Sequence, residues 1–172
     1  MNESEIGKRR SGGLAAGGPM ARLLHRVGNP LVAAVLRSPV HGLLSDSLLL
    51  LTVRGRRTGR DHTFPVQYAR DGQTLYVVPG GREDKRRWRN LLAPATVQVR
   101  LRGHDVTGIG QVFLAEDDPE LVAEAMGTYL PRFPSSARIR GLTVTNGRIA
   151  EDDAQLRAAS AQDAIVQIKL QL

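Results

Sequence analysis

The sequence contains no cysteine, only three lysines and few aromatic residues, and each shortage narrows what the protein can be. Without cysteine there is no disulfide, no thiolate metal site and no cysteine nucleophile. This composition agrees with a reducing cytoplasm, which is the location we expect. Aromatic residues make up 4% of the chain, whereas binding of single-stranded nucleic acid usually needs several aromatic side chains for base stacking.

Long hydrophobic runs are also missing. The longest run, Leu48 to Leu51, suits a buried strand and is far too short to span a bilayer. Residues 1–19 are rich in glycine and lack the apolar segment of a secretion signal, so we expect a flexible tail there. The chain has 172 residues, and residues 20–172 are therefore expected to form one domain.

Motifs for binding nucleotide phosphates (GxGxxG after a strand, GxxxxGK[S/T]) and for serine hydrolysis (GxSxG) do not occur in the sequence. The four histidines are scattered, so no metal site is expected. The acidic groups Asp117–Asp118 and Glu151–Asp153 precede expected helices, where carboxylates act as caps. No side chain stands out as a catalytic nucleophile or base, so the reactive atoms of any enzyme here belong to a cofactor.

The pattern of apolar residues predicts strands over 47–53, 62–70, 74–78, 96–101, 106–114 and 164–170. Bulges are expected at Gly108 and Gly110. Helices are predicted over 20–28, from Pro30 to just before Pro39, and over 82–93, 119–130 and 150–160. Short turns between the strands favour antiparallel pairing, and we therefore predict an α+β fold, a small barrel of about six strands with helices packed outside.

The two helices predicted within residues 20–37 are amphipathic, with arginines beside an apolar stripe. Such helices usually cover a hydrophobic core. The alternative is peripheral contact with a membrane surface, and the sequence leaves both open.

The formal net charge is +7, and nearly all of the positive charge is arginine. Two basic clusters stand out, and together they hold nine of the 24 Lys and Arg residues: Arg54, Arg56, Arg57 and Arg60, then Arg82, Lys85, Arg86, Arg87 and Arg89. Glycines within and before the clusters let backbone N–H groups approach a ligand. If the predicted strands 62–70 and 74–78 form one hairpin, His62 lies beside residues 78–80 and the clusters converge into an anion site.

Two other interpretations of the clusters stay open. Charged loops are often only solvated surface, although here glycine, threonine, tryptophan and asparagine are interleaved with the arginines. A basic face also attracts nucleic-acid backbones, but no known binding motif accompanies it, so no specific nucleic-acid partner is expected.

At these residues the sequence resembles the deazaflavin-dependent nitroreductase family, whose members are split β-barrel proteins related to flavin oxidoreductases. The matching segments run from Leu48 to Gly103: LLLLTVRGRRTGR, TFPVQYARDGQTLYVVPGG and WRNLLAPATVQVRLRG. The resemblance implies a split barrel that binds coenzyme F420, an anionic deazaflavin with a phosphodiester and an oligoglutamate tail. FMN is less expected, because it lacks the long anionic tail that two basic clusters would suit.

The resemblance also implies roles for individual residues. The phosphate or tail would be held by Arg56, Arg57, Thr58 and Gly59. The cofactor channel would be lined by His62, Phe64 and Pro65, the ring would rest on Val78, Pro79, Gly80 and Gly81, and the site would be closed by Arg87, Trp88 and Asn90. On the substrate side the corresponding residues are Gln67, Tyr129 and Phe133.

The activity implied by the family is transfer of a hydride from reduced F420 to a quinone, a nitroaromatic or a similar small electron acceptor. The alternative is a non-catalytic relative of the same fold that binds a lipid or the cofactor alone. The sequence fixes neither the natural substrate nor the oligomeric state.

Overall fold

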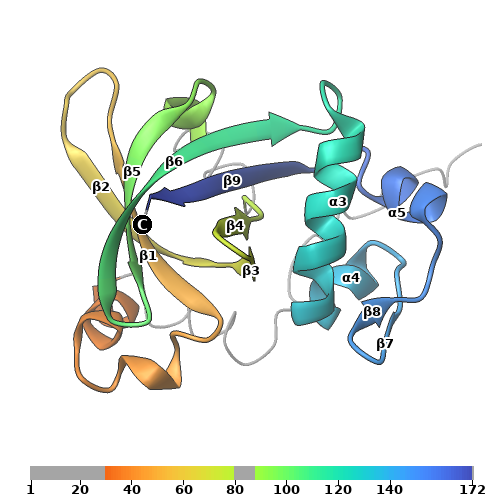
Figure 1. Cartoon of the computed structure of the whole chain (residues 1–172), viewed down its shortest axis with the longest axis horizontal. Coiled ribbons are helices and arrows are strands. Elements are labelled where there is room, and N and C mark those ends of the chain that lie inside the picture. The colour runs from red at the N-terminus through yellow and green to blue at the C-terminus, as the bar shows by residue number, and fades with distance from the viewer. Residues whose placement is uncertain (1–29, 80–87, 172) are drawn as a thin grey trace, which may run out of the picture.

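A computed structural model describes residues 30–79 and 88–171, which form a curled antiparallel sheet beside a group of short helices (Figure 1). The strands of the sheet are β1 (Leu48–Arg54), β2 (Asp61–Gln67), β3 (Ala69–Asp71), β4 (Thr74–Val77), β5 (Ala95–Leu101), β6 (His104–Leu114) and β9 (Ala164–Gln171). The longer helical elements are residues 30–37, α3 (Pro119–Tyr129), α4 (Pro134–Ile139) and α5 (Asp153–Ala159). Single 3₁₀ turns are η1 (His41–Leu43), η2 (Arg89–Leu91) and η3 (Leu130–Arg132), and β7 (Val144–Thr145) pairs with β8 (Arg148–Ile149).

The sheet has the strand order β2-β1-β5-β6-β9-β4-β3, with antiparallel pairing throughout. Its two edge strands, β2 and β3, are consecutive in the chain, and only Tyr68 separates them. The segment 61–71 thus pairs first with β1 and then with β4, which closes the sheet into a barrel at one end. At the other end no described residue of β2 pairs with β4, and the barrel is split there; we call this the open end.

The predicted α+β antiparallel split barrel is confirmed. The sheet has seven strands instead of about six, because the predicted strand 62–70 divides at Tyr68. The predicted hairpin between 62–70 and 74–78 is wrong for its first half. Only β3 pairs with β4, whereas His62 lies opposite Val53 of β1 and not beside residues 78–80.

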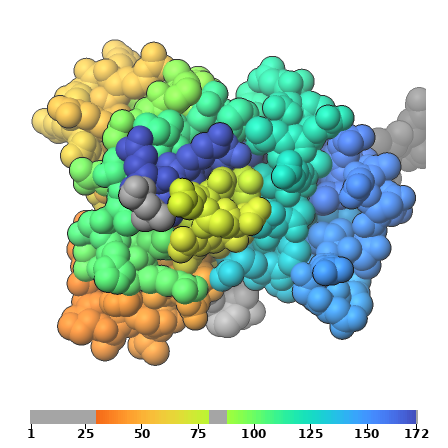
Figure 2. All heavy atoms as spheres, viewed as in Figure 1, coloured from red at the N-terminus to blue at the C-terminus, as the bar shows by residue number. Residues whose placement is uncertain are grey.

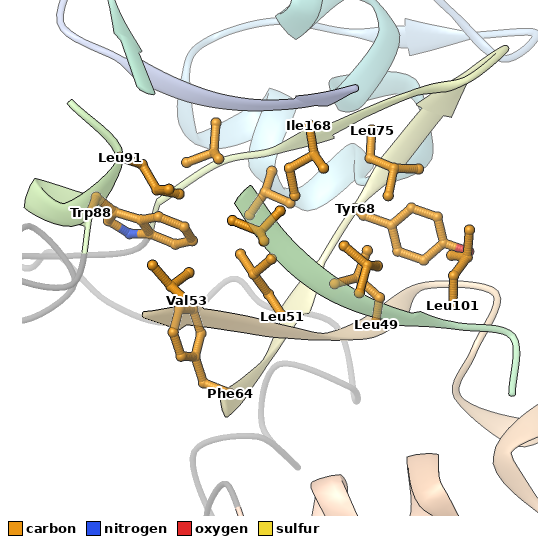
Figure 3. Packing of buried hydrophobic residues seen from close by; sticks show 14 of the residues in the cluster. Leu49, Leu51, Val53, Phe64, Tyr68, Leu75, Trp88, Leu91, Leu101 and Ile168 are labelled. Atoms are coloured by element: carbon orange, nitrogen blue, oxygen red, sulfur yellow. The ribbon is translucent and has the colours of Figure 1, made fainter. Parts of the chain in front are cut away.

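The interior of the barrel is a continuous apolar core that runs from Trp88 at the open end to Tyr68 at the closed end (Figure 3). Tyr68 is buried, and its hydroxyl donates a hydrogen bond of 2.9 Å to the carbonyl oxygen of Ser45. Its backbone N–H donates to the carbonyl oxygen of Ser47. Both bonds fix Tyr68, where the strand changes partners, to the turn that precedes β1.

Strand β1 is apolar without alternation because both of its faces are covered. Leu49, Leu51 and Val53 point into the barrel core, while Leu48 and Leu50 pack under the helix of residues 30–37. That helix buries Val32, Ala33 and Leu36 against them. Its apolar face therefore covers the sheet, the first of the two interpretations that the sequence left open.

The other predictions for the N-terminal region and for the second basic cluster fall largely outside the described residues. These are the tail 1–19, the helix 20–28 and most of the helix 82–93, of which η2 is the described end. Within residues 30–79 and 88–171, no helix is long and apolar enough to cross a membrane.

The helices on the other side of the barrel begin where the sequence placed acidic caps. The Asp118 side chain accepts a hydrogen bond from the Leu121 N–H at the start of α3, and Asp152 forms a capping box with Gln155 at the start of α5. Helix α5 begins at Asp153 and not at Ala150, because Glu151 is used differently. Its carboxylate accepts the Thr143 N–H at 3.0 Å, which ties the β7–β8 hairpin to the helix and lowers the pKa of Glu151.

The predicted bulges at Gly108 and Gly110 are absent, since the described register runs without interruption along β5, β6 and β9. Close packing of the strands explains the glycines at these two positions. A Cβ atom on Gly108 would lie 2.9 Å from both Ile168 Cγ2 and the Lys169 carbonyl oxygen, and one on Gly110 would lie 3.2 Å from Val97 Cγ1. Neighbouring strands approach β6 too closely at these positions for a side chain.

Replacing Gly108 by alanine is expected to destabilise the protein by about 1–3 kcal/mol, because the backbone of β9 must move. The matched control is Gly42→Ala, since nothing lies within 4 Å of the added methyl group. Urea unfolding of both variants measures the difference. Equal midpoints would show that β6 and β9 are not packed as closely as described.

One ion pair joins the helical side to the sheet. The guanidinium of Arg140, at the end of α4, donates from Nε and Nη2 to the two carboxylate oxygens of Asp163 at 2.7 and 2.8 Å, and Asp163 precedes β9. Both side chains are about four-fifths buried, with exposures of 19% and 20%. The hydrogen bonds that Arg140 donates to Asp163 raise the pKa of Arg140 further, so the pair stays ionised.

Arg140→Ala is expected to cost about 2–3 kcal/mol of unfolding free energy, because it leaves the Asp163 carboxylate without its charged partner. Arg157→Ala removes the more exposed pair with Glu120, whose closest atoms are 3.7 Å apart, and should change stability by less than about 0.5 kcal/mol. Thermal unfolding compares the two. A larger loss for the second variant would contradict this ranking.

Candidate anion-binding site at the open end of the barrel

The first basic cluster lies in the tight loop of residues 55–60 between β1 and β2. The Gly55 N–H donates to the Arg60 carbonyl at 2.8 Å, and the Gly59 N–H donates to the Gly55 carbonyl at 2.9 Å. Gly59 has a φ of +63°, a conformation that glycine adopts without strain. A Cβ atom on Gly55 would lie within 3.3 Å of Thr58 Oγ1 and His62 Nε2, so glycine lets these side chains come close to the backbone.

The arginines of this loop are exposed and carry charge that no neighbouring carboxylate neutralises. Arg54, Arg56, Arg57 and Arg60 form no ion pair with any residue in the described part of the chain. Four other described arginines are paired: Arg100 with Asp105, Arg102 with Asp46, Arg140 with Asp163 and Arg157 with Glu120. In Figure 2 the loop of residues 55–60 belongs to the gold segment that projects from the surface of the barrel at the upper left, where an anionic molecule can reach it.

The loop also presents backbone donors. The N–H groups of Arg57 and Thr58 donate to no partner among the described residues, whereas the N–H groups of Gly55, Arg56, Gly59 and Arg60 are bonded. Successive free N–H groups in a turn bind anions well, because each contributes a partial positive charge without any side-chain entropy. The guanidinium groups and these two amides form one donor set.

Turn η2, which begins at Arg89 at the end of the second basic cluster, touches this loop directly. The backbone N–H of Arg56 donates to Oδ1 of Asn90 at 3.2 Å, across 34 positions of the sequence. The two clusters were expected to converge through a hairpin of residues 62–70 with 74–78, but only β3 of the first arm pairs with β4. The loops meet for a different reason: β1 ends, β2 begins, β4 ends and β5 begins at the same end of the barrel.

Trp88 closes the core beneath this contact. Its indole ring packs edge-on against Phe64, with ring centroids 5.5 Å apart and an interplanar angle of 83°, and only 5% of its surface is exposed. Figure 3 shows Trp88, Phe64, Val53 and Leu91 gathered at this end of the core. The Trp88 Nε1–H is buried and has no hydrogen-bond partner in the part of the chain that the structure describes. Trp88 thus forms the floor of the open end.

The other predicted site residues divide between the two faces of β2. His62 and Phe64 share the barrel face with Val53 and Leu51, their partners in β1. Pro65 and Gln67 lie opposite Leu50 and Leu48, on the outer face. Val78 and Pro79 follow β4 and are half-buried, and Gly80, Gly81 and Arg87 lie outside the described residues.

Tyr129 and Phe133 belong to the helical side. Their rings are 4.5 Å apart, and both are buried in the cluster that α3 and α4 form against the sheet. Burial raises the pKa of Tyr129, so its phenol stays protonated at any ordinary pH. The structure does not bring these two residues into contact with the arginine loop.

A hollow of about 520 Å³, which was not predicted from the sequence, lies on the outer face of β2, β1 and β5. Thr52 and Thr63 share a hydrogen bond of 2.7 Å there, and Gln98 and Arg100 lie on the neighbouring strand. These residues come from separate strands, and only the sheet register brings them together. No group of histidines and carboxylates suited to a metal occurs among residues 30–79 and 88–171.

The split antiparallel barrel carries at its open end arginines and backbone amides that have no partner among the described residues, a donor set suited to a small anionic ligand. Residues 33–137, well over half of the chain, match the model of one family, the F420H(2)-dependent quinone reductases. The chain belongs to this family, and its cofactor is coenzyme F420. The donor set at the open end fits the phosphodiester and carboxylates of that cofactor.

Solved structures with a similar chain path include an F420-H2 dependent reductase, which shares 12% identity with a TM-score of 0.49. That alignment covers 71% of this chain and 93% of the other. A second is a protein from Bacteroides thetaiotaomicron assigned to 5-nitroimidazole antibiotic resistance, with 13% identity, a TM-score of 0.42, and coverage of 77% and 78%. No curated protein sequence matches the chain.

Replacing Arg56 and Arg57 together by alanine is expected to weaken binding of F420 by about 2–4 kcal/mol in total, because two charge-assisted contacts are lost. The control is Arg138→Ala with Arg148→Ala, which removes the same charge from exposed arginines of the helical side. Fluorescence titration measures both affinities. If both double variants lost affinity equally, only net charge would matter, and the loop would not be the binding site.

Proposed function

We propose that this chain binds reduced coenzyme F420 at the open end of the barrel and uses it to reduce a quinone, a nitroaromatic or a similar small electron acceptor. The main observation that supports the proposal is that the arginines and amides of residues 55–60 have no anionic partner among the described residues. Membership of the F420H(2)-dependent quinone reductase family supports the same assignment.

In this proposal Arg56, Arg57 and the N–H groups of Arg57 and Thr58 hold the anionic part of the cofactor. A glycine at position 59 lets the loop turn tightly enough for these donors to face one ligand. Because the loop is exposed, its charge also attracts the anionic cofactor from solution and speeds association at low ionic strength.

The side of the site nearer the barrel is apolar. His62 and Phe64 stand at the rim, and Val78 and Pro79 leave β4 at the same end of the sheet. Trp88 and Leu91 fill the space below and keep water out of the barrel. Bound F420 supplies the hydride, and the residues of the chain orient it and exclude water.

The experiment is a fluorescence titration of the purified chain with F420 and, in parallel, with FMN. It is followed by a turnover assay of reduced F420 with menadione and with a nitroimidazole. We expect saturable binding of F420 alone and oxidation of the reduced cofactor by at least one acceptor.

Each other outcome points to a different function. Tighter binding of FMN than of F420 would overturn the cofactor assignment for this chain. Binding of F420 without turnover of any quinone or nitro acceptor would favour a non-catalytic relative that only holds the cofactor.

A further inference from the structure

Asn90 makes the one described hydrogen bond that leads from a backbone N–H of the arginine loop to a residue outside it. The other bonded amides of the loop are satisfied internally: Gly55 by Arg60, Gly59 by Gly55, and Arg60 by the Thr58 hydroxyl at 3.4 Å. The Arg56 N–H instead reaches Oδ1 of Asn90 at 3.2 Å. This contact therefore ties the backbone of the loop to η2, in addition to the β1–β2 pairing that ends at Arg54 and Asp61.

Asn90 is well placed to hold the loop, because its neighbours in the chain are fixed in the core. Trp88 is 5% exposed and packs against Phe64, and Leu91 is fully buried. A polar side chain between two buried residues keeps its position better than one on a free loop, since its backbone cannot move without disturbing the core.

The chemistry of the contact argues against a direct role for Oδ1 in binding an anion. A carbonyl oxygen accepts hydrogen bonds and repels a phosphate or carboxylate oxygen. In the structure, Asn90 Oδ1 accepts a hydrogen bond from the Arg56 N–H. The next backbone N–H along the chain is that of Arg57. Holding residue 56 in place thus aims the free amides of Arg57 and Thr58 in one direction.

We propose that Asn90 is a positioning residue, which orients the arginine loop for the anionic part of the cofactor by accepting the Arg56 backbone N–H. The inference rests on the proposed function for its effect on affinity, but the contact itself exists without any ligand. Preorganising the loop lowers the entropy lost when the ligand binds, and this is the source of the gain in affinity.

The test combines a double-mutant cycle with amide exchange. F420 affinity is measured by fluorescence for the wild type, for Asn90→Ala, for Arg56→Ala with Arg57→Ala, and for all three substitutions together. Exchange of the Arg56 amide with water is measured by NMR in the ligand-free protein. Gln98→Ala is the control, because it removes an exposed amide side chain from the outer face of β5.

We expect Asn90→Ala to weaken F420 binding about 3- to 10-fold, the effect of one hydrogen bond, and to speed exchange of the Arg56 amide several-fold. In the background that lacks the Arg56 and Arg57 side chains, the same substitution should cost a smaller factor, because Asn90 then orients only the backbone amides of the loop. Gln98→Ala should change neither quantity. Asn90→Asp keeps the acceptor oxygen and should preserve the slow exchange while weakening binding through its negative charge.

Two results would overturn the inference. If Asn90→Ala weakened binding equally in both backgrounds, Asn90 would contact the cofactor itself. If exchange of the Arg56 amide were unchanged in a variant that melts like the wild type, the hydrogen bond would not hold the loop. Absence of F420 binding by the wild type would refute the proposed function, whereas the exchange experiment would still decide the role of Asn90.

Discussion

The segment of residues 61–71 supplies both edges of the sheet, and its change of partners at Tyr68 determines the shape of the molecule. As β2 it pairs with β1, and as β3 it pairs with β4. A flat sheet would hold these two edges far apart, so one continuous segment can serve both only if the sheet curls. Tyr68 is held at this point by its buried ring and by bonds to the carbonyl groups of Ser45 and Ser47.

The open end of the barrel follows from the same constraint. Because β2 turns to β1 at this end, it leaves β4, and β1 and β4 both end beside the opening. The arginine loop follows β1 there, and the Arg56–Asn90 bond joins it to η2. The arginines of residues 54–60, which form no ion pair among the described residues, are thus gathered at one end of the barrel.

Several elements could be predicted from the sequence because their signals are local. A helix start is indicated by Asp118 directly before Pro119, and another by Asp152 three residues before Gln155. Both are local signals of helix capping. The unbroken apolar run Leu48 to Leu51 indicated a strand buried on both faces, and the helix of residues 30–37 provides the second cover. The errors concern pairing: the hairpin at Asp71–Gly72 is correct, but its arms are only three and four residues long.

By itself, the sequence determined the charge, the clusters of arginine, the antiparallel α+β class and the bounds of α3 and of the helix of residues 30–37, since these depend on composition and on neighbouring residues. It also pointed to a family, through residues that are close together in the chain. Only the tertiary structure decided that His62 faces the barrel while Pro65 and Gln67 face outward, that Trp88 lies in the core, and that Asn90 bonds to Arg56. These features depend on register and on contacts between distant segments, which local pattern does not encode.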